Sequence, residues 1–172
     1  MHIKVCNNEV YKDRRGYFTV NYQSSSYFKN VNFIQDNESY SKKNVFRGMH
    51  FQKYPFSQSK LIRVVYGKII DFIMDVRPAS KHFKKLHVFE LDSSKKKSIF
   101  IPKGYAHGFL VLSDFAIFQY KVDNKFSHKH SFGFNIFENL SKLGYQKSKL
   151  ILSKTDKFYS EIDKVDHKNL IF

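Results

Sequence analysis

The chain has 172 residues, and 30 Lys and Arg against 15 Asp and Glu give it a formal net charge of +15. A chain of this length is expected to form one domain, residues 1–172, with a core that needs no metal or disulfide. Its 42% of hydrophobic residues excludes a mainly disordered chain. The single cysteine, Cys6, excludes an internal disulfide framework. No apolar run reaches the roughly 20 residues of a membrane span, and the first residues lack a signal-peptide pattern, so a soluble cytoplasmic domain is expected.

The excess of lysine admits several kinds of partner. Most lysines are dispersed, and the clusters at residues 84–85 and 95–97 are expected in loops between strands. No helix-turn-helix, zinc-finger or RNA-binding motif accompanies them, so nucleic acid is not the expected partner. The charge fits a solvated surface or an anionic small substrate.

Short apolar runs, punctuated by polar residues and glycine, predict a series of strands. They cover residues 31–35, 45–52, 60–66, 69–76, 86–91, 98–101, 108–112 and 115–122. The pair Gly67-Lys68 predicts a hairpin between residues 60–66 and 69–76. Only residues 157–165, with Phe158, Ile162 and Val165 at helical spacing, predict a helix. The sequence therefore predicts an all-β sandwich or barrel with a short C-terminal helix.

Ionisable residues interrupt several of these strands. The two-residue period of a strand places Asp71, Ile73 and Asp75 on one face, and Ala116, Phe118 and Tyr120 on one face of another strand. In residues 47–52 the same period places residues 48, 50 and 52 on one face and residues 47, 49 and 51 on the other.

Five of these side chains together suggest a cavity. A single buried histidine or tyrosine is usually an ordinary core residue, whereas a group of buried ionisable residues is costly unless it serves a purpose. A base, a cation, a carboxylate and a phenol facing one interior suit a pocket better than a core. The residues concerned are His50, Lys60, Asp71, His107 and Tyr120.

Several ordered motifs, spread over roughly residues 5 to 160, resemble the dTDP-4-dehydrorhamnose 3,5-epimerase family. They are Asp13-x-Arg15-Gly16-x-Phe18, Gln35-Asp36-Asn37-x-Ser39, Arg47-Gly48-Met49-His50-Phe51-Gln52, Lys60-Leu61, Asp71-x-x-x-Asp75-x-Arg77-x-x-Ser80, Ile101-Pro102-x-Gly104-Tyr105-Ala106-His107-Gly108-Phe109 and Leu152-Ser153-x-x-Asp156. The resemblance implies a cupin-type jelly roll, a homodimer, and action on a nucleotide-linked 4-keto sugar without metal or organic cofactor.

The resemblance also implies catalytic roles. His50 is the base that removes a proton beside the ketone, and Asp156 orients its imidazole. Lys60 stabilises the enolate oxygen, and Tyr120 returns a proton from the opposite face of the sugar.

Substrate-binding roles follow from the same resemblance. Arg47 meets the diphosphate, His107 and Asp71 form a supporting pair in the cavity, and Phe18, Gln35 and Asn37 help to hold the nucleotide. Gln52 and Phe126 complete the predicted substrate-binding residues.

The chain departs from the family pattern on the nucleotide side. Phe126 and Ser131 stand where members carry a second tyrosine and a glutamate, and a tryptophan-containing segment is missing. The predicted substrate is therefore a dTDP-4-keto-6-deoxyhexose or a GDP-linked 4-keto hexose or heptose, for surface polysaccharide. Inversion at C3, at C5 or at both stays open.

Three alternatives remain. A metal-dependent cupin enzyme would pair two histidines one residue apart with a glutamate and a third histidine, whereas the corresponding strand here has Gln52 after His50, and His128 and His130 lack a carboxylate partner. A sugar-nucleotide 3,4-ketoisomerase shares the expected fold, but the Arg-Gly-Met-His-Phe-Gln and Ala-His-Gly-Phe runs favour the epimerases. The third alternative is a non-catalytic module that binds a sugar or nucleic acid.

Overall fold

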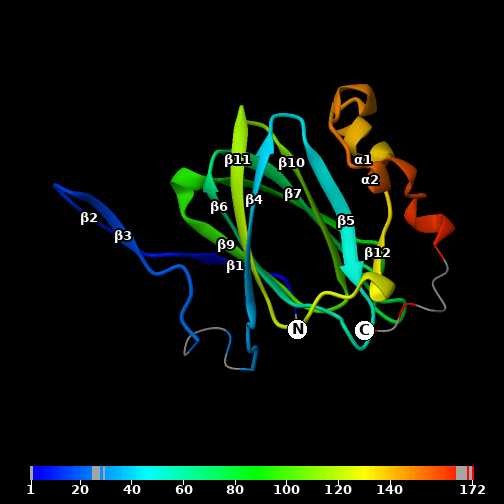
Figure 1. Cartoon of the computed structure of the whole chain (residues 1–172), viewed down its shortest axis with the longest axis horizontal. Helices are drawn as coiled ribbons and strands as arrows, with labels where there is room; N and C mark the ends of the chain where they lie inside the picture. The colour runs from blue at the N-terminus through cyan, green and yellow to red at the C-terminus, as the bar shows by residue number, and fades with distance from the viewer. Residues whose placement is uncertain (1, 25–27, 29, 166–169, 171) are drawn as a thin grey trace.

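The computed structural model describes residues 2–24, 28, 30–165, 170 and 172, and two antiparallel sheets dominate it (Figure 1). The first sheet has the order β1 (Lys4–Asn7), β9 (Lys97–Ile101), β6 (Lys60–Tyr66), β11 (Phe115–Val122) and β4 (Gln35–Lys42). The second has the order β12 (Ser131–Gly133), β5 (Phe46–Gln52), β10 (Tyr105–Val111), β7 (Lys68–Asp75) and β8 (Leu86–Asp92).

The two sheets pack face to face through one apolar cluster. Ile62 and Phe118 enter it from the first sheet, and Ile73, Phe109 and Val111 enter it from the second. Because side chains alternate along a strand, one face of each sheet supplies this core. The cluster does not fill the whole space between the sheets, and the polar cavity described below lies in the same layer.

The other face of the second sheet carries a second core, which the C-terminal part of the chain covers. Phe46 and Met49 of β5 and Phe72 of β7 pack there against Phe134 and Leu140. Leu140 lies in helix α1 (Phe137–Lys142), and helix α2 (Lys154–Phe158) follows. Figure 1 shows both helices beside β5 and β12. Single 3₁₀ turns lie at Ser93–Lys95, His128–His130, Lys147–Lys149 and Ile162–Lys164.

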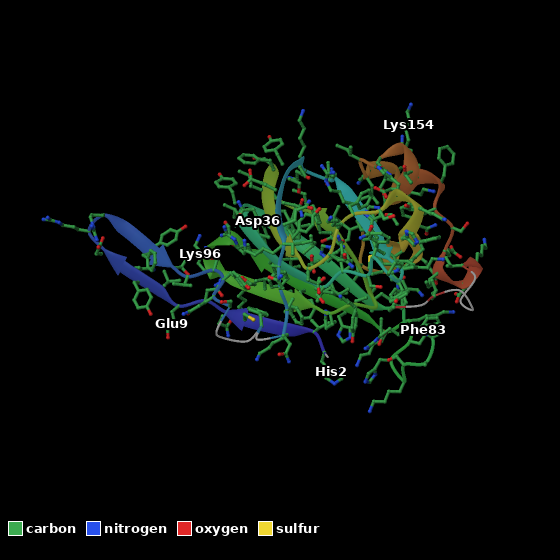
Figure 2. All side chains as sticks on the ribbon, turned by 60° about the horizontal axis from the view of Figure 1, so that its bottom comes forward. His2, Glu9, Asp36, Phe83, Lys96 and Lys154 are labelled. Atoms are coloured by element: carbon green, nitrogen blue, oxygen red, sulfur yellow. The ribbon has the colours of Figure 1, made fainter. Side chains whose placement is uncertain are left out.

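A hairpin of β2 (Val10–Asp13) and β3 (Gly16–Thr19) projects from the body of the molecule. It stands clear of both sheets in Figure 1 and again in Figure 2, where Glu9 marks its start. Its aromatic side chains are exposed, Phe18 to 64%. An isolated two-stranded hairpin is marginally stable in water.

The all-β prediction is confirmed, and the predicted strands 60–66 and 115–122 coincide with β6 and β11. The predicted hairpin at Gly67 is wrong, because β6 and β7 belong to different sheets. Gly67, at φ +85°, turns the chain from one sheet to the other so close to Phe115 that a Cβ would lie 2.3 Å from the Phe115 carbonyl oxygen.

Two other predicted elements are also corrected. The strand expected at residues 31–35 is wrong, because β4 begins only at Gln35. It continues through the polar residues 36–42, whose side chains alternate between the cavity side and solvent. The helix expected over residues 157–165 is not continuous: α2 ends at Phe158, which is exposed, and a 3₁₀ turn follows at Ile162–Lys164. Ile162 and Val165 do pack against the second core, but an extended segment separates them from α2.

In the part of the chain that the structure describes, no helix is long and apolar enough to cross a membrane.

Candidate active site

A cavity between the two sheets has two lobes that meet at the same five residues. The inner lobe has a volume of about 250 Å³, and the outer lobe of about 470 Å³. Ser39, Arg47, His107, Phe109 and Phe118 line only the inner lobe. Gln58, Phe126, His128, Ser131, Thr155 and Tyr159 are among those that line only the outer lobe. Both lobes contact His50, Lys60, Tyr120, Ser153 and Asp156.

Strand β5 places both Arg47 and His50 on this cavity, although a regular strand would point them to opposite sides. In the pairing with β10, His50 lies opposite His107 and Arg47 lies opposite Phe109, so β5 has one residue more than β10 between these pairs. Such a β-bulge shifts the alternation by one position. The predicted alternation over residues 47–52 is therefore wrong for Arg47, which shares the cavity with His50.

Two glycines allow the bulged backbone to lie against β10. Gly48 has φ +121°, a conformation that favours glycine, and a Cβ there would lie 2.6 Å from the Cα of Gly108. A Cβ on Gly108 would in turn lie 2.8 Å from the Arg47 carbonyl oxygen. Side chains at either position would force the strands apart at the point that sets the placement of His50.

The imidazole of His50 is held by a carboxylate from the C-terminal part of the chain. Its Nε2 lies 2.6 Å from Oδ1 of Asp156, which is buried at the start of α2. Ser153 caps this helix, since its Oγ accepts a hydrogen bond from the Asp156 N–H at 3.0 Å. With Nε2 bonded to the carboxylate, Nδ1 is the nitrogen available to accept a proton.

A second histidine–carboxylate pair lies next to the first. His107 Nε2 is 2.6 Å from Oδ1 of Asp71, whose side chain is completely buried, so the predicted pair is present. Burial raises the pKa of Asp71, and the contact with His107 opposes this rise. Burial also lowers the pKa of the Lys60 amine to about 8, with the negative charge of Asp71 opposing the change. Lys60 is therefore a cation of reduced basicity.

Tyr120, on the same sheet as Lys60, faces His50 and His107 from the opposite sheet. It lies directly across from Asn37 of β4 and Ile62 of β6, so all three share the inward face. Burial raises the pKa of the Tyr120 phenol, and the charge of Arg47 opposes the rise. The phenol is consequently neutral near pH 7 and able to donate a proton.

Strand β4 brings three polar residues to the same inward face. Ser39 lies opposite Phe118, Asn37 opposite Tyr120 and Gln35 opposite Val122. The Gln35 side-chain amide donates to Asn37 Oδ1 at 2.6 Å, so the two predicted nucleotide-binding residues contact each other. The Ser39 hydroxyl is buried and has no hydrogen-bond partner among the described residues, which leaves it available to a ligand in the inner lobe.

The remaining predicted site residues lie in different places. The Arg47 guanidinium, at the rim of the inner lobe, donates to Ser41 Oγ at 2.9 Å. Phe126 lies on the outer lobe, with its ring 4.8 Å from that of His128. Phe18, on the projecting hairpin, lies outside both lobes of this chain.

Gln52 lines the outer lobe, but its side-chain amide is already occupied. It donates to the carbonyl oxygens of Phe56 and Lys125 at 2.9 and 3.1 Å and accepts from the Ser127 N–H at 2.6 Å. These three bonds use both donors and the oxygen of the amide. Gln52 therefore holds two loops together, and its predicted contact with substrate stays a prediction.

Sequence reasoning did not single out several lining residues, Tyr159, Gln58 and Thr155 among them, and it gave no role to Ser39 and Ser153, which stand in the family motifs. The place of Ser39 on the cavity could have been predicted from its alternation with Asn37, and the capping role of Ser153 from its position three residues before Asp156. Tyr159 and Gln58 lie in extended or loop segments, where no periodicity indicates a facing direction. Among the described residues, no group of three or more His, Cys, Asp or Glu is arranged to hold a metal ion.

Comparison with known proteins agrees with this geometry. The profile of the dTDP-4-dehydrorhamnose 3,5-epimerase family matches residues 2–164. The chain belongs to this family. It is 37% identical over 174 residues to the dTDP-4-dehydrorhamnose 3,5-epimerase of Escherichia coli, covering 98% of this chain and 94% of that protein. It is also 40% identical over 128 residues to that of Methanothermobacter thermautotrophicus, covering 73% of this chain and 69% of that protein.

Solved structures of the family have the same fold. A dTDP-6-deoxy-D-glucose-3,5-epimerase of Legionella pneumophila, crystallised with dTDP-4-keto-L-rhamnose, superposes with a TM-score of 0.90. It is 30% identical, and the match covers 98% of this chain and 92% of that one. The cupin-type fold that the resemblance implies is confirmed.

Proposed function

We propose that this chain epimerises a nucleotide-linked 4-keto sugar by removing and returning a proton at carbon atoms next to the ketone. The observation that carries the proposal is that His50 of one sheet, paired with Asp156 of α2, and the neutral phenol of Tyr120 on the facing sheet line one cavity. Epimerisation needs a base on one side of the sugar ring and an acid on the other.

The proposed reaction proceeds through an enolate. The C4 ketone acidifies the C–H bonds at C3 and C5, because the electron pair left by the proton delocalises onto the ketone oxygen. His50 Nδ1 takes the proton, and Asp156 stabilises the imidazolium that forms. The cationic amine of Lys60 stabilises the enolate oxygen, where a fixed charge in a dry site contributes a few kcal/mol. Tyr120 then protonates the carbon from the opposite face, and the configuration is inverted.

The diphosphate of the substrate suits the cationic rim of the cavity. Arg47 lies at the inner lobe and can bond phosphate oxygens through its guanidinium. The nucleoside then extends from this rim, with Asn37 and Gln35 on β4 and Phe126 on the outer lobe as candidate contacts.

The nucleotide is proposed as dTDP or GDP, and a thermal melt distinguishes them. The named relatives are dTDP-sugar enzymes, whereas Phe126 and Ser131 on the outer lobe depart from the family pattern. A ligand present at 100 times its Kd stabilises the folded state by about 2.7 kcal/mol. Stabilisation by dTDP with no effect of GDP would end the GDP hypothesis, and the opposite result would end the dTDP assignment.

Solvent deuterium tests the reaction and the positions it inverts. The chain is incubated in deuterated buffer with dTDP- and GDP-linked 4-keto sugars, and NMR locates the label. Label at C3 alone indicates a 3-epimerase, and label at C3 and C5 indicates a 3,5-epimerase. No label with any of these sugars contradicts the proposed function.

We also propose that the chain forms a homodimer in which a second copy covers the projecting hairpin. All residues of β2 are exposed, and the aromatic rings of β3 are exposed as well, with Phe18 against Tyr11 of the same hairpin and Tyr17 under Lys96. Phe18, predicted to hold the nucleotide, would then reach the cavity of the second copy. Light scattering of the wild type and of Phe18→Ser tests this, with Phe158→Ser as control, because Phe158 is also exposed, to 86%. A monomeric wild type would overturn the proposal.

A further inference from the structure

Tyr159 lies against the proposed base, and nothing in the reaction above uses it. It directly follows α2, the helix that carries Asp156, and its ring is centred 5.9 Å from the imidazole of His50 in an edge-to-face arrangement of 66°. It lines the outer lobe beside both residues of the pair. Edge-to-face pairs of this kind contribute about 0.5–1.5 kcal/mol beyond the area they bury.

The ring of Tyr159 occupies a space that only glycine leaves open. Gly133 of β12 pairs directly with His50 of β5, so the two residues share one face of the sheet. A Cβ on Gly133 would lie 2.4 Å from Cε2 and 2.5 Å from Cζ of Tyr159. The ring therefore lies over the backbone of the neighbouring strand, next to the imidazole.

The backbone of this segment is fixed independently of the ring. The side-chain amide of Asn135 donates to the Tyr159 carbonyl oxygen, and the Asn135 N–H donates to the Ser160 carbonyl at 2.9 Å. A bridge between Asn135 and Glu161 continues the contact. The segment after α2 is thus tied to the residues that directly follow β12, the strand that borders β5, and the ring has little freedom to move away from His50.

Asp156 alone does not determine the orientation of His50. The imidazole has one hydrogen bond in the described structure, from Nε2 to Asp156, and its side chain is 41% exposed. A single bond of this kind permits rotation of the ring about the bond axis, and such rotation would move Nδ1 away from the substrate. A second, non-covalent contact on the ring removes this freedom.

We propose that Tyr159 is a positioning residue for His50: its ring, seated over Gly133, holds the imidazole in the orientation in which Asp156 engages Nε2 and Nδ1 receives the substrate proton. The contact is made by the ring, so the hydroxyl group is dispensable. Burial and the negative charge of Asp156 raise the pKa of the phenol, so Tyr159 adds no second charge beside the base. The inference rests on the proposed function, in which His50 is the base.

The test compares Tyr159→Phe, Tyr159→Ala and a control, Tyr145→Ala. Tyr145 is also half-buried and packs against the second core without lining either lobe. Solvent exchange into the substrate gives kcat and KM. We expect Tyr159→Phe and Tyr145→Ala to retain kcat within about twofold and Tyr159→Ala to lower it about tenfold with KM within twofold, because misplaced groups lose rate more than binding.

NMR of ¹⁵N-histidine-labelled, substrate-free protein supplies a second measurement, independent of activity. We expect the Nε2–H resonance of His50 to be observed in the wild type, Tyr159→Phe and Tyr145→Ala, and to broaden or disappear in Tyr159→Ala. If Tyr159→Ala does not fold, Tyr159→Leu, which keeps apolar volume without an aromatic ring, takes its place.

Two results would overturn the inference. One is unchanged kcat and an unchanged His50 resonance when the ring is removed. The other is an equal loss in Tyr159→Phe and Tyr159→Ala, which would assign the hydroxyl a direct contact with substrate. A wild type that exchanges no solvent hydrogen refutes the proposed function instead, and the NMR comparison still decides the placement of His50.

Discussion

Raising the pH should inactivate the enzyme while it stabilises the fold, and Lys60 is the cause of both effects. The pKa of this amine falls to about 8 because the side chain is buried between the sheets. About nine-tenths of the molecules carry the cation at pH 7, and about one-tenth carry it at pH 9. If only the charged amine stabilises the enolate, kcat/KM falls about tenfold over this interval.

The effect on stability has the opposite sign. Between pH 8 and 10.5 the unfolded chain holds a proton on Lys60 that the folded chain has released, so the free energy of unfolding rises with pH in this window. The pKa of Lys60 is about 8 in the folded chain and 10.5 in the unfolded chain. This difference corresponds to a change of at most about 3 kcal/mol in the free energy of unfolding. Alkaline loss of activity through Lys60 is therefore distinguishable from unfolding.

The assay measures kcat/KM from pH 6.5 to 9.5, because this ratio reports groups of the free enzyme, and follows urea unfolding at the same pH values. Lys60→Arg is the matched variant, since its guanidinium stays charged throughout, and its alkaline limb should disappear. The raised pKa of Tyr120 keeps that phenol neutral over this range. A flat profile in the wild type, or a fall in activity that follows unfolding, would refute the role of Lys60.

Three further predictions concern the base, the acid and the strand that carries the base. His50→Asn and Tyr120→Phe should each lower solvent exchange by about 10²–10⁴-fold with unchanged thermal stability; exchange at the wild-type rate would exclude the residue as acid or base. Asp156→Asn should lower kcat at least tenfold, because an amide cannot stabilise the imidazolium, and a change in KM alone would contradict this. Gly48→Ala should cost about 2–4 kcal/mol in urea unfolding, since its Cβ would meet Gly108 at 2.6 Å; a cost below 0.5 kcal/mol would show that the bulge tolerates a side chain.

Strand periodicity predicted the facing direction of those site residues that lie in regular strands. Lys60, Asp71 and Tyr120 face the interior, as the two-residue period of β6, β7 and β11 requires. These strands alternate without interruption over the relevant residues, so local pattern and final orientation agree.

Periodicity failed where the backbone is irregular. The extra residue in β5 brings Arg47 to the side of His50, and its cause is the close contact of Gly48 with Gly108, sixty residues away in the chain. The turn at Gly67 has the composition of a hairpin, yet it joins two sheets because the partners of β6 and β7 come from elsewhere in the chain. Neither outcome is a property of the local sequence.

The amino-acid sequence by itself determined the all-β class, the inward faces of the regular strands and, through ordered motifs, the family. Only the tertiary structure decided how the cavity is assembled, with Asp156 brought to His50 across 106 residues and Tyr159 seated over Gly133. The physical reason is that a strand's pattern depends on its nearest neighbours in the chain, whereas a reaction centre depends on distances between segments that only long-range packing sets.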